Sequence, residues 1–336
     1  MNKSTILTGI TTTGTPHLGN YVGAIRPAIE ASKDPSATPF YFLADYHALI
    51  KCQDPEKVRQ SSLEIAATWL ALGLDTSNAT FYRQSDIPEI MELSWMLTCS
   101  ASKGLMNRAH AYKAVVAENE ATPNTDPDKG INMGLFSYPI LMAADMLIFN
   151  ANKVPVGKDQ IQHIEMARDI AARFNHAYGE HFVLPEAIID DNASTLAGLD
   201  GRKMSKSYNN TIPLFSTEKK LKKLINKIKT NSLEPGEPKD PTDCTLFSTY
   251  KAFASEQEVA DIRKQYAEGI AWGEMKKVLF EKINTQVAPA RDRYEALMQE
   301  PAHIEQQLQE GAEKARAISM PFIAELRKAV GIQRMV

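Results

Sequence analysis

Two lysines three positions apart give this chain a segment suited to handling phosphate charge. They are Lys203 and Lys206, within residues 203–207 (KMSKS). A glycine-rich approach and the polar exit at 208–210 predict a loop that moves. A mobile pair of ammonium groups suits a polyphosphate whose negative charge shifts during a reaction. Most lysine-bearing loops are solvated surface, so this segment alone does not indicate a phosphate site. A second segment of the same type makes the prediction much more specific.

A second segment of the phosphate-binding type lies about 190 residues earlier, at residues 12–20 (TTGTPHLGN). An expected strand ends before it, the chain turns at Gly14, and an expected helix begins near His17. Helix N-termini expose unpaired N–H groups with partial positive charge, which bind phosphate. His17 and Asn20 can donate to phosphate oxygens, and Gly19 lets a nucleotide approach the backbone. The segment is neither a Walker loop nor a GxGxxG fingerprint, and a turn with a capping histidine is the alternative.

Composition narrows the class of protein. The 336 residues, 43% hydrophobic and 24% charged, suffice for a large α/β domain and a smaller one. A net charge of -3 excludes a globally polybasic nucleic-acid binder, so any RNA contact needs a local patch. Three cysteines without a CxxC pair argue against a structural metal and fit a reducing compartment. We expect neither an apolar signal core nor a membrane span, and therefore a cytoplasmic enzyme.

Short β-rich runs alternate with helical patterns over the first part of the chain. Strands are expected at 6–10, 39–45, 79–83 and 153–157, with helices from near 17 and at 54–73, 88–117, 133–150 and 159–175. This alternation predicts an α/β fold with a doubly wound, Rossmann-like parallel sheet. Proline, asparagine, aspartate and glycine at 118–131 predict a long loop.

Strand signals vanish after residue 216, and helical patterns continue to the end with one proline-rich interruption at 235–241. The sequence therefore predicts a second, all-helical domain. We expect a catalytic domain over 1–214, a helical domain over 215–300, and a last helix within 301–336 that packs back on the first domain.

The two charged segments together resemble the signatures of class I aminoacyl-tRNA synthetases. Residues 17–20 (HLGN) look like the HIGH signature, and residues 203–207 are identical to the KMSKS signature. The resemblance implies activation of an amino acid with ATP and Mg²⁺, with His17, Asn20, Lys203 and Lys206 stabilising charge that grows on the phosphates. It implies ATP contacts from Thr11, Thr12, Thr13, Gly19, Asn20, Gly157, Lys158, Asp159, Leu196, Lys203, Met204, Ser205, Lys206 and Ser207.

Three further segments, at 44–49, 134–147 and 154–165, are similar to those of bacterial tryptophanyl-tRNA synthetases, which belong to subclass Ic. The sequence departs from the common pattern at 11–13, where many relatives carry Gln-Pro-Ser, and at Leu7, where many carry an aromatic residue. The resemblance implies tryptophan and tRNA(Trp) as partners, a homodimer, and anticodon binding by the helical domain.

The spacing of three residues is compatible with a pocket for an aromatic ligand. Tyr138, Met142 and Asp145 stand at i, i+4 and i+7 and share one helix face. A ring and a thioether can sandwich an aromatic ligand, and a buried carboxylate can accept from an indole N–H, which only donates. The alternative is that the first two are core residues and Asp145 pairs with a nearby base. With the resemblance, the expected tryptophan site is Asp145, Tyr138, Met142, Gln160, Leu7 and His47.

Gly157, Lys158 and Asp159 follow an expected strand and open a helix. Nucleotides bind at such carboxyl ends of strands in doubly wound sheets. The resemblance implies that Asp159 accepts a hydrogen bond from the ribose, and a helix N-cap is the alternative role.

Six lysines lie close together near the start of the helical domain, interleaved with apolar residues at helical spacing. They are Lys219, Lys220, Lys222, Lys223, Lys227 and Lys229. An amphipathic helix with a basic face would bind RNA phosphates in a salt-dependent way. A charged face that is only solvated is an equally good interpretation.

Three other functions remain open at this level. A tyrosine-specific sister synthetase would need two polar groups for a phenolic hydroxyl, whereas Met142 beside a single Asp145 suits indole better. A nucleotidyltransferase that ignores tRNA would not need the lysine-rich helix. A synthetase-like RNA-binding protein without catalysis would not need His17, Asn20 and both loop lysines intact.

Overall fold

The computed structural model describes residues 4–189 and 195–333, except for the side chain of Asp159. Its centre is a five-stranded parallel sheet in the order β3-β2-β1-β4-β5. The strands are β1 (Ser4–Thr11), β2 (Ala37–Ala44), β3 (Thr80–Arg83), β4 (Lys153–Pro155) and β5 (Glu186–Ile188). The chain runs outward from β1 to β3 on one side and returns to β4 and β5 on the other. The predicted doubly wound α/β fold is confirmed, and the strand order reverses beside β1.

Alternation along β2 explains why helices cover both faces of the sheet. Phe40 and Phe42 belong to one buried cluster, with residues of α5 (Pro88–Ser100), α8 (Met133–Leu147) and α9 (Ile161–Tyr178). Tyr41 and Leu43 belong to the opposite cluster, with residues of α2 (Arg26–Ala31) and α4 (Pro55–Ala71). Successive side chains of a strand point to opposite faces, so a continuously apolar strand needs a cover on each.

The four predicted strands are confirmed, and β5 is an additional one. Its three residues carry only a weak strand pattern, and its pairing with β4 comes from tertiary contact. The helix expected near His17 forms as α1 (Leu18–Asn20), a π-helical turn η1 (Tyr21–Ile25) and α2. Pro27 lies in the first turn of α2, where its missing N–H is tolerated. As predicted, α4 begins after Asp54, whose carboxylate accepts from the N–H groups of Glu56 and Lys57.

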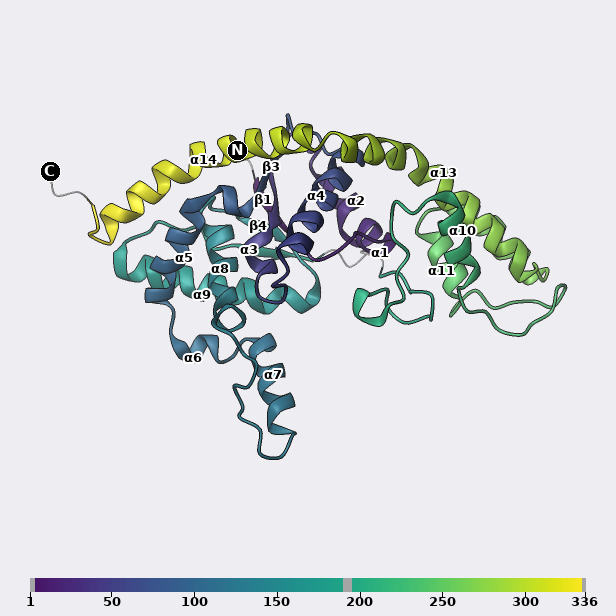
Figure 1. The fold of residues 1–336 in the computed structure, drawn as a ribbon, viewed down its shortest axis with the longest axis horizontal. Coiled ribbons are helices and arrows are strands. Elements are labelled where there is room, and N and C mark those ends of the chain that lie inside the picture. The colour runs from purple at the N-terminus through teal and green to yellow at the C-terminus, as the bar shows by residue number, and fades with distance from the viewer. Residues whose placement is uncertain (1–3, 190–194, 334–336) are drawn as a thin grey trace.

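The helical patterns expected at 88–117 are confirmed, but this stretch is not one continuous helix. It is divided into α5, α6 (Lys103–Met106) and α7 (His110–Glu120), with Ala101 in an extended conformation after α5. The loop that follows is fastened by Asn119, whose amide donates to the carbonyls of Pro127 and Lys129 at 2.8 and 2.9 Å. Figure 1 shows α7 projecting away from the body of the molecule.

The second part of the chain is helical, as predicted. It contains α10 (Glu218–Asn226), α11 (Thr245–Lys251), α12 (Glu256–Ala267), α13 (Trp272–Gln299) and α14 (Pro301–Ala329). In Figure 1, α13 and α14 form one long arc that joins the helical part to the sheet. Where α14 crosses β3, a Cβ on Gly311 would lie 1.7 Å from the carbonyl oxygen of Phe81, so only glycine permits this approach. No helix in the described ranges is long and apolar enough to span a membrane.

Candidate active site

The first predicted phosphate segment begins where β1 ends, at Thr11. His17 is the N-cap of α1: its Nδ1 accepts from the N–H of Asn20 at 3.3 Å, and its own N–H donates to Oδ1 of Asn20 at 3.1 Å. Because Nδ1 accepts, the proton of the neutral ring must be on Nε2. The histidine is therefore both the cap of the alternative interpretation and a fixed Nε2–H donor.

Two glycines of this segment allow neighbouring groups to approach its backbone closely. Gly14 has a φ of +73° and donates its N–H to Oγ of Ser61 at 2.8 Å. A Cβ on Gly19 would lie 3.1 Å from the His17 ring and 3.5 Å from Cβ of Met204. Gly19 therefore lies where the first signature segment packs against the second.

Lys206 completes the junction between these segments. Its ammonium donates to the carbonyl oxygen of Thr13, and a Cβ on Gly14 would lie 3.3 Å from its Nζ. Burial, followed by the nearby Lys206, lowers the pKa of His17 from 6.5 to about 4. Loss of solvation also lowers the pKa of Lys206. The loop lysine thus reaches the turn of the first segment, where an anion would be surrounded by donors.

The loop that carries Lys203 and Lys206 is organised by Asn210, which is 2% exposed. Oδ1 of Asn210 accepts from the N–H of Ser205 at 2.8 Å, while its Nδ2 donates to the carbonyl of Lys203 at 3.1 Å and to Asp200 at 2.7 Å. A Cβ on Gly198 would lie 2.3 Å from this amide. Asn210 therefore fixes the loop backbone and leaves the lysine side chains outside.

The remaining loop residues expected at the ATP site lie in this same assembly. The N–H of Met204 donates to the carbonyl of Leu196 at 2.8 Å, and both side chains are buried with Leu18 of α1. The hydroxyls of Ser205 and Ser207 are 2.8 Å apart. Thr11 and Thr13 are exposed on the opposing segment, so they are open to a ligand. Thr12 is 1% exposed, and its hydroxyl has no partner among the described residues.

The third predicted ATP segment lies at the strand reversal. Gly157 and Lys158 are exposed and follow β4, and Lys158 opens the short 3₁₀ turn η3 (Lys158–Gln160) that precedes α9. Asp159 belongs to this turn, but its side chain lies outside the described part of the structure. The backbone thus runs as expected for a nucleotide site at the carboxyl end of a strand.

Asp145 of α8 is 1% exposed, and both of its oxygens have partners. Nε2 of His47 lies 2.9 Å from Oδ2, and Nε2 of Gln84 donates to Oδ1 at 2.7 Å. Burial raises the pKa of Asp145, against the opposing effect of these two groups. The pairing of Asp145 with a nearby base is therefore present, as the alternative interpretation anticipated. A carboxylate has about four acceptor positions, so a further donor such as an indole N–H can still bind.

Tyr138 lies one helical turn from Met142 and faces α9. Its hydroxyl bonds to Nε2 of His163, and Nδ1 of His163 lies 2.8 Å from Oε1 of Gln160. The Tyr138 and His47 rings meet edge to face, 6.5 Å apart. Met142 is half-buried against the core, and Leu7 is 2% exposed within it. Contacts thus link His47 directly to Asp145 and to Tyr138, and link Tyr138 through His163 to Gln160.

Sequence reasoning missed three residues of these networks: Gln84, His163 and Asn210. Gln84 follows β3 directly, and a polar residue at the carboxyl end of a strand was the available signal. His163 stands three positions after Gln160, in the first turn of α9. Asn210 had no signal beyond its place after the lysine loop.

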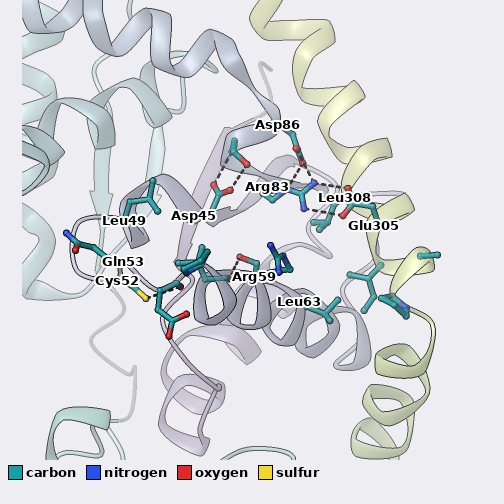
Figure 2. A pocket seen from close by; sticks show the side chains of 18 residues that line it. Asp45, Leu49, Cys52, Gln53, Arg59, Leu63, Arg83, Asp86, Glu305 and Leu308 are labelled. Atoms are coloured by element: carbon teal, nitrogen blue, oxygen red, sulfur yellow. Dashed lines mark hydrogen bonds and ion pairs between the residues drawn. The ribbon is translucent and has the colours of Figure 1, made fainter.

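A separate cavity of about 820 Å³ opens between α3 (Asp45–Ala48), the start of α4, the end of β3 and the start of α14. Figure 2 shows Arg83 on its wall, joined to Asp86 and Glu305 by ion pairs of 3.1 and 2.7 Å. None of the described side chains predicted to bind ATP or tryptophan lines this cavity. The predicted site residues lie elsewhere, at the junction of the signature segments, after β4 and in the polar network around Asp145.

Comparison with known proteins agrees with this arrangement. A model of the family "tRNA synthetases class I (W and Y)" matches residues 1–288. The tryptophan–tRNA ligase of Neisseria meningitidis is 60% identical over 333 residues, which cover 99% of both chains. That of Pseudomonas aeruginosa is 62% identical over 98% of this chain and 74% of its own length.

A solved structure is also closely similar. The tryptophanyl-tRNA synthetase of Campylobacter jejuni, in complex with ADP and tryptophan, superposes with a TM-score of 0.88 and 43% identity. The match covers 97% of this chain and 99% of that one. The chain therefore belongs to the class I tryptophanyl- and tyrosyl-tRNA synthetase family.

Proposed function

We infer that this chain is an aminoacyl-tRNA synthetase that joins tryptophan to tRNA. The observation that carries this conclusion is the 60% identity to a tryptophan–tRNA ligase along 99% of both chains. The tyrosine-specific alternative is disfavoured at this level of identity. ATP is the energy source, in keeping with the ADP and tryptophan bound to the relative from Campylobacter jejuni.

We propose that the junction of the signature segments performs the activation step. An oxygen of the tryptophan carboxylate attacks the α-phosphorus of ATP, and the bond to pyrophosphate breaks with its electron pair on the leaving group. Neutral His17 donates through Nε2–H, and Asn20 helps to hold the phosphates. The ammonium of Lys206 contacts the carbonyl of Thr13 in this structure, and it moves from there to the departing pyrophosphate. Lys203 binds the same leaving group.

Charge growth explains the choice of these groups. Ammonium ions and fixed N–H donors bind the pyrophosphate more strongly as it gains negative charge, so they lower the barrier more than they stabilise bound ATP. We propose that Thr11, Thr13, Gly157 and the Asp159 region complete the ATP site. No covalent enzyme intermediate is required.

We propose that Mg²⁺ enters with ATP. Mg²⁺ is usually held by substrate phosphates and waters with one or two carboxylates, and not by a protein cage. The described residues contain no cluster of three or more His, Cys, Asp or Glu that could hold a metal ion by itself. The arrangement therefore suits a metal ion delivered by the substrate.

We propose that tryptophan binds against Tyr138, Met142 and Leu7, with its indole N–H donating to Asp145. The carboxylate is held by His47 at 2.9 Å, so the acceptor is fixed before the ligand arrives. Gln160, linked through His163 to Tyr138, is expected near the amino-acid end of the ligand. A ligand without an N–H leaves one acceptor position of this buried carboxylate unfilled, which disfavours other side chains.

We propose that the helical part binds tRNA(Trp), with domain boundaries at 1–214, 215–300 and 301–336. In α10, Leu221 and Ile225 are buried, whereas all six lysines of 219–229 are exposed. An exposed basic face suits the RNA backbone, and its binding should weaken as salt rises. Replacing Lys219, Lys220 and Lys223 by glutamine should make tRNA binding less sensitive to salt. The slope of the log binding constant against the log salt concentration should become shallower by roughly 0.7 to 0.9 per lost phosphate contact. An unchanged slope would count against this surface.

We also propose a homodimer in the cytoplasm. Helix α5 exposes Met91 and Trp95, one turn apart and 42% and 69% accessible, and exposed apolar groups of this kind suit a partner surface. Trp95→Glu should convert a dimer to a monomer in light scattering, whereas Met320→Glu on α14 should not. A wild-type monomer would contradict the proposal. The cytoplasm supplies ATP and tRNA, and its reducing conditions suit three free cysteines.

Charging of tRNA tests the proposed function. With ATP and Mg²⁺, the protein should attach radiolabelled tryptophan to tRNA(Trp) and should not attach tyrosine to tRNA(Tyr). Adenylate formation without transfer to tRNA would point to the nucleotidyltransferase alternative. tRNA binding without either reaction would point to an RNA-binding protein.

A further inference from the structure

Gln84 is a fully buried amide outside the set of residues that the proposed reaction uses. It is 0% exposed and stands first in the short turn η2 (Gln84–Asp86), directly after β3. Its Nε2 donates to Oδ1 of Asp145 at 2.7 Å, and its Oε1 accepts from the N–H of Tyr46 at 3.2 Å. The side chain therefore connects the start of α3 with the carboxylate on α8.

The partners of Gln84 fix which way its amide points. A backbone N–H can only donate, so the N–H of Tyr46 requires the oxygen of the amide. The NH₂ group must then face Asp145, and because it can only donate, Oδ1 of Asp145 must accept. His47 approaches the other oxygen at 2.9 Å. Two residues from different elements thus set the plane of the carboxylate.

We propose that Gln84 is a positioning residue for tryptophan selection, which holds the Asp145 carboxylate as a hydrogen-bond acceptor aimed at the indole N–H. This inference rests on the proposed role of Asp145. Gln84 does not touch the substrate and acts through the carboxylate alone. A buried acceptor held by two donors keeps its lone pairs in fixed directions, and fixed directions are what discrimination by one hydrogen bond requires.

The surroundings explain why such support is needed. Burial favours the neutral acid at Asp145, while the hydrogen bonds from His47 and Gln84 favour the carboxylate. The negative charge of Asp45 also raises the pKa of Asp145 and so favours its neutral form. The buried hydroxyl of Tyr82 lies in the field of this carboxylate and has no partner among the described residues. A neutral Asp145 could turn its own proton toward the ligand, and selection would then be lost.

A purely structural role for Gln84 makes a different prediction. If the amide only tied α3 to α8, its loss would lower stability and slow every amino-acid substrate to the same extent. If it positions Asp145, its loss should affect only substrates that use the indole N–H. The sulfur analogue β-(3-benzothienyl)alanine separates the two, because sulfur replaces the N–H within nearly the same shape.

The experiment compares Gln84→Met with the wild-type protein in ATP–pyrophosphate exchange. We expect kcat/KM for tryptophan to fall roughly 10- to 100-fold, as for loss of a hydrogen bond to a charged group. The value for the sulfur analogue should change less than about threefold, within the range of neutral substitutions, and KM for ATP should stay the same. Gln257→Met, on the exposed side of α12, is the matched control and should change neither substrate. An equal fall for both substrates, or no change for tryptophan, would overturn the proposal.

A second variant keeps the test decisive if Gln84→Met does not fold. Gln84→Glu has the same shape, and its protonated form can donate to Asp145 as the amide does. Two carboxylates this close share one proton. The preference for tryptophan over the sulfur analogue should therefore persist at low pH and decline as pH rises, whereas a pH-independent preference would refute the role. Failure of the wild-type protein to exchange tryptophan would reject the proposed function, and equal wild-type use of both substrates would reject the role of Asp145.

Discussion

His17 should titrate near pH 4, far below an ordinary histidine. Burial of the ring and the ammonium of Lys206 lower its pKa from 6.5 to about 4, with burial the larger cause. The Nδ1 atom accepts from the N–H of Asn20 at 3.3 Å, so a proton there would also break the cap of α1. At neutral pH the ring is therefore uncharged, with its only proton on Nε2.

The magnitude follows from linkage between protonation and folding. The unfolded chain takes up a proton below about pH 6.5, whereas the folded protein resists it until about pH 4. Above pH 6.5, His17 is neutral in both states and does not change the free energy of unfolding. As pH falls from 6.5 to 4, the unfolded chain binds the proton first and the free energy of unfolding decreases. The loss is about 2 kcal/mol at pH 5 and about 3 kcal/mol below pH 4, at 1.36 kcal/mol for each pH unit.

NMR of the histidine Cε1–H groups measures this value directly. The His17 signal is assigned by its absence from His17→Asn, and its midpoint should lie near pH 4. In Lys206→Met the midpoint should rise but remain below 6.5, because burial persists. Unfolding by urea should show that acidification from pH 7.5 to 5 destabilises the wild-type protein about 2 kcal/mol more than His17→Asn. A His17 midpoint near 6.5, or one unmoved by loss of Lys206, would refute this description of the site.

Three further predictions concern other groups. Lys206→Ala should slow single-turnover adenylate formation by roughly 100-fold or more, as for loss of a transition-state donor, with an unchanged melting temperature; unchanged activation would contradict its role. Asp145→Ala should raise KM for tryptophan far more than KM for ATP, and equal changes in both would count against an indole acceptor. Gly311→Ala should destabilise the protein by about 1 to 3 kcal/mol in thermal unfolding, because the new methyl would lie 1.7 Å from the carbonyl of Phe81. Gly104→Ala has open space around its Cβ and is the control; equal stability of the two variants would show that α14 can move aside.

Much of the fold could be predicted from local sequence patterns. Buried strands such as β2 are continuous apolar runs in the sequence. The start of α4 is predictable from Asp54 and Pro55, because these residue types are typical of an N-cap and a first helical position. The short β5 was not found, because its three residues gain their strand conformation from pairing with β4. The division of 88–117 into α5, α6 and α7 was also missed, since each fragment alone has ordinary helical composition.

The site was predictable where function depends on spacing along the chain. His17 and Asn20 form their cap three residues apart, and Tyr138 and Asp145 share a helix face seven apart. Gln84 and Asp145 are 61 residues apart and meet only through the sheet, so no local pattern could pair them. The contact of Lys206 with Thr13 spans 193 residues, and only the resemblance of both segments to known signatures placed them together.

Activation of tryptophan is tested most directly by ATP–pyrophosphate exchange with each of the twenty amino acids, in the presence of Mg²⁺ and without tRNA. We expect exchange with tryptophan and with no other amino acid. Exchange driven by tyrosine would contradict the assignment of Asp145 as an indole acceptor. A folded protein that exchanges with none of the twenty would show that the junction of the two signature segments does not activate tryptophan.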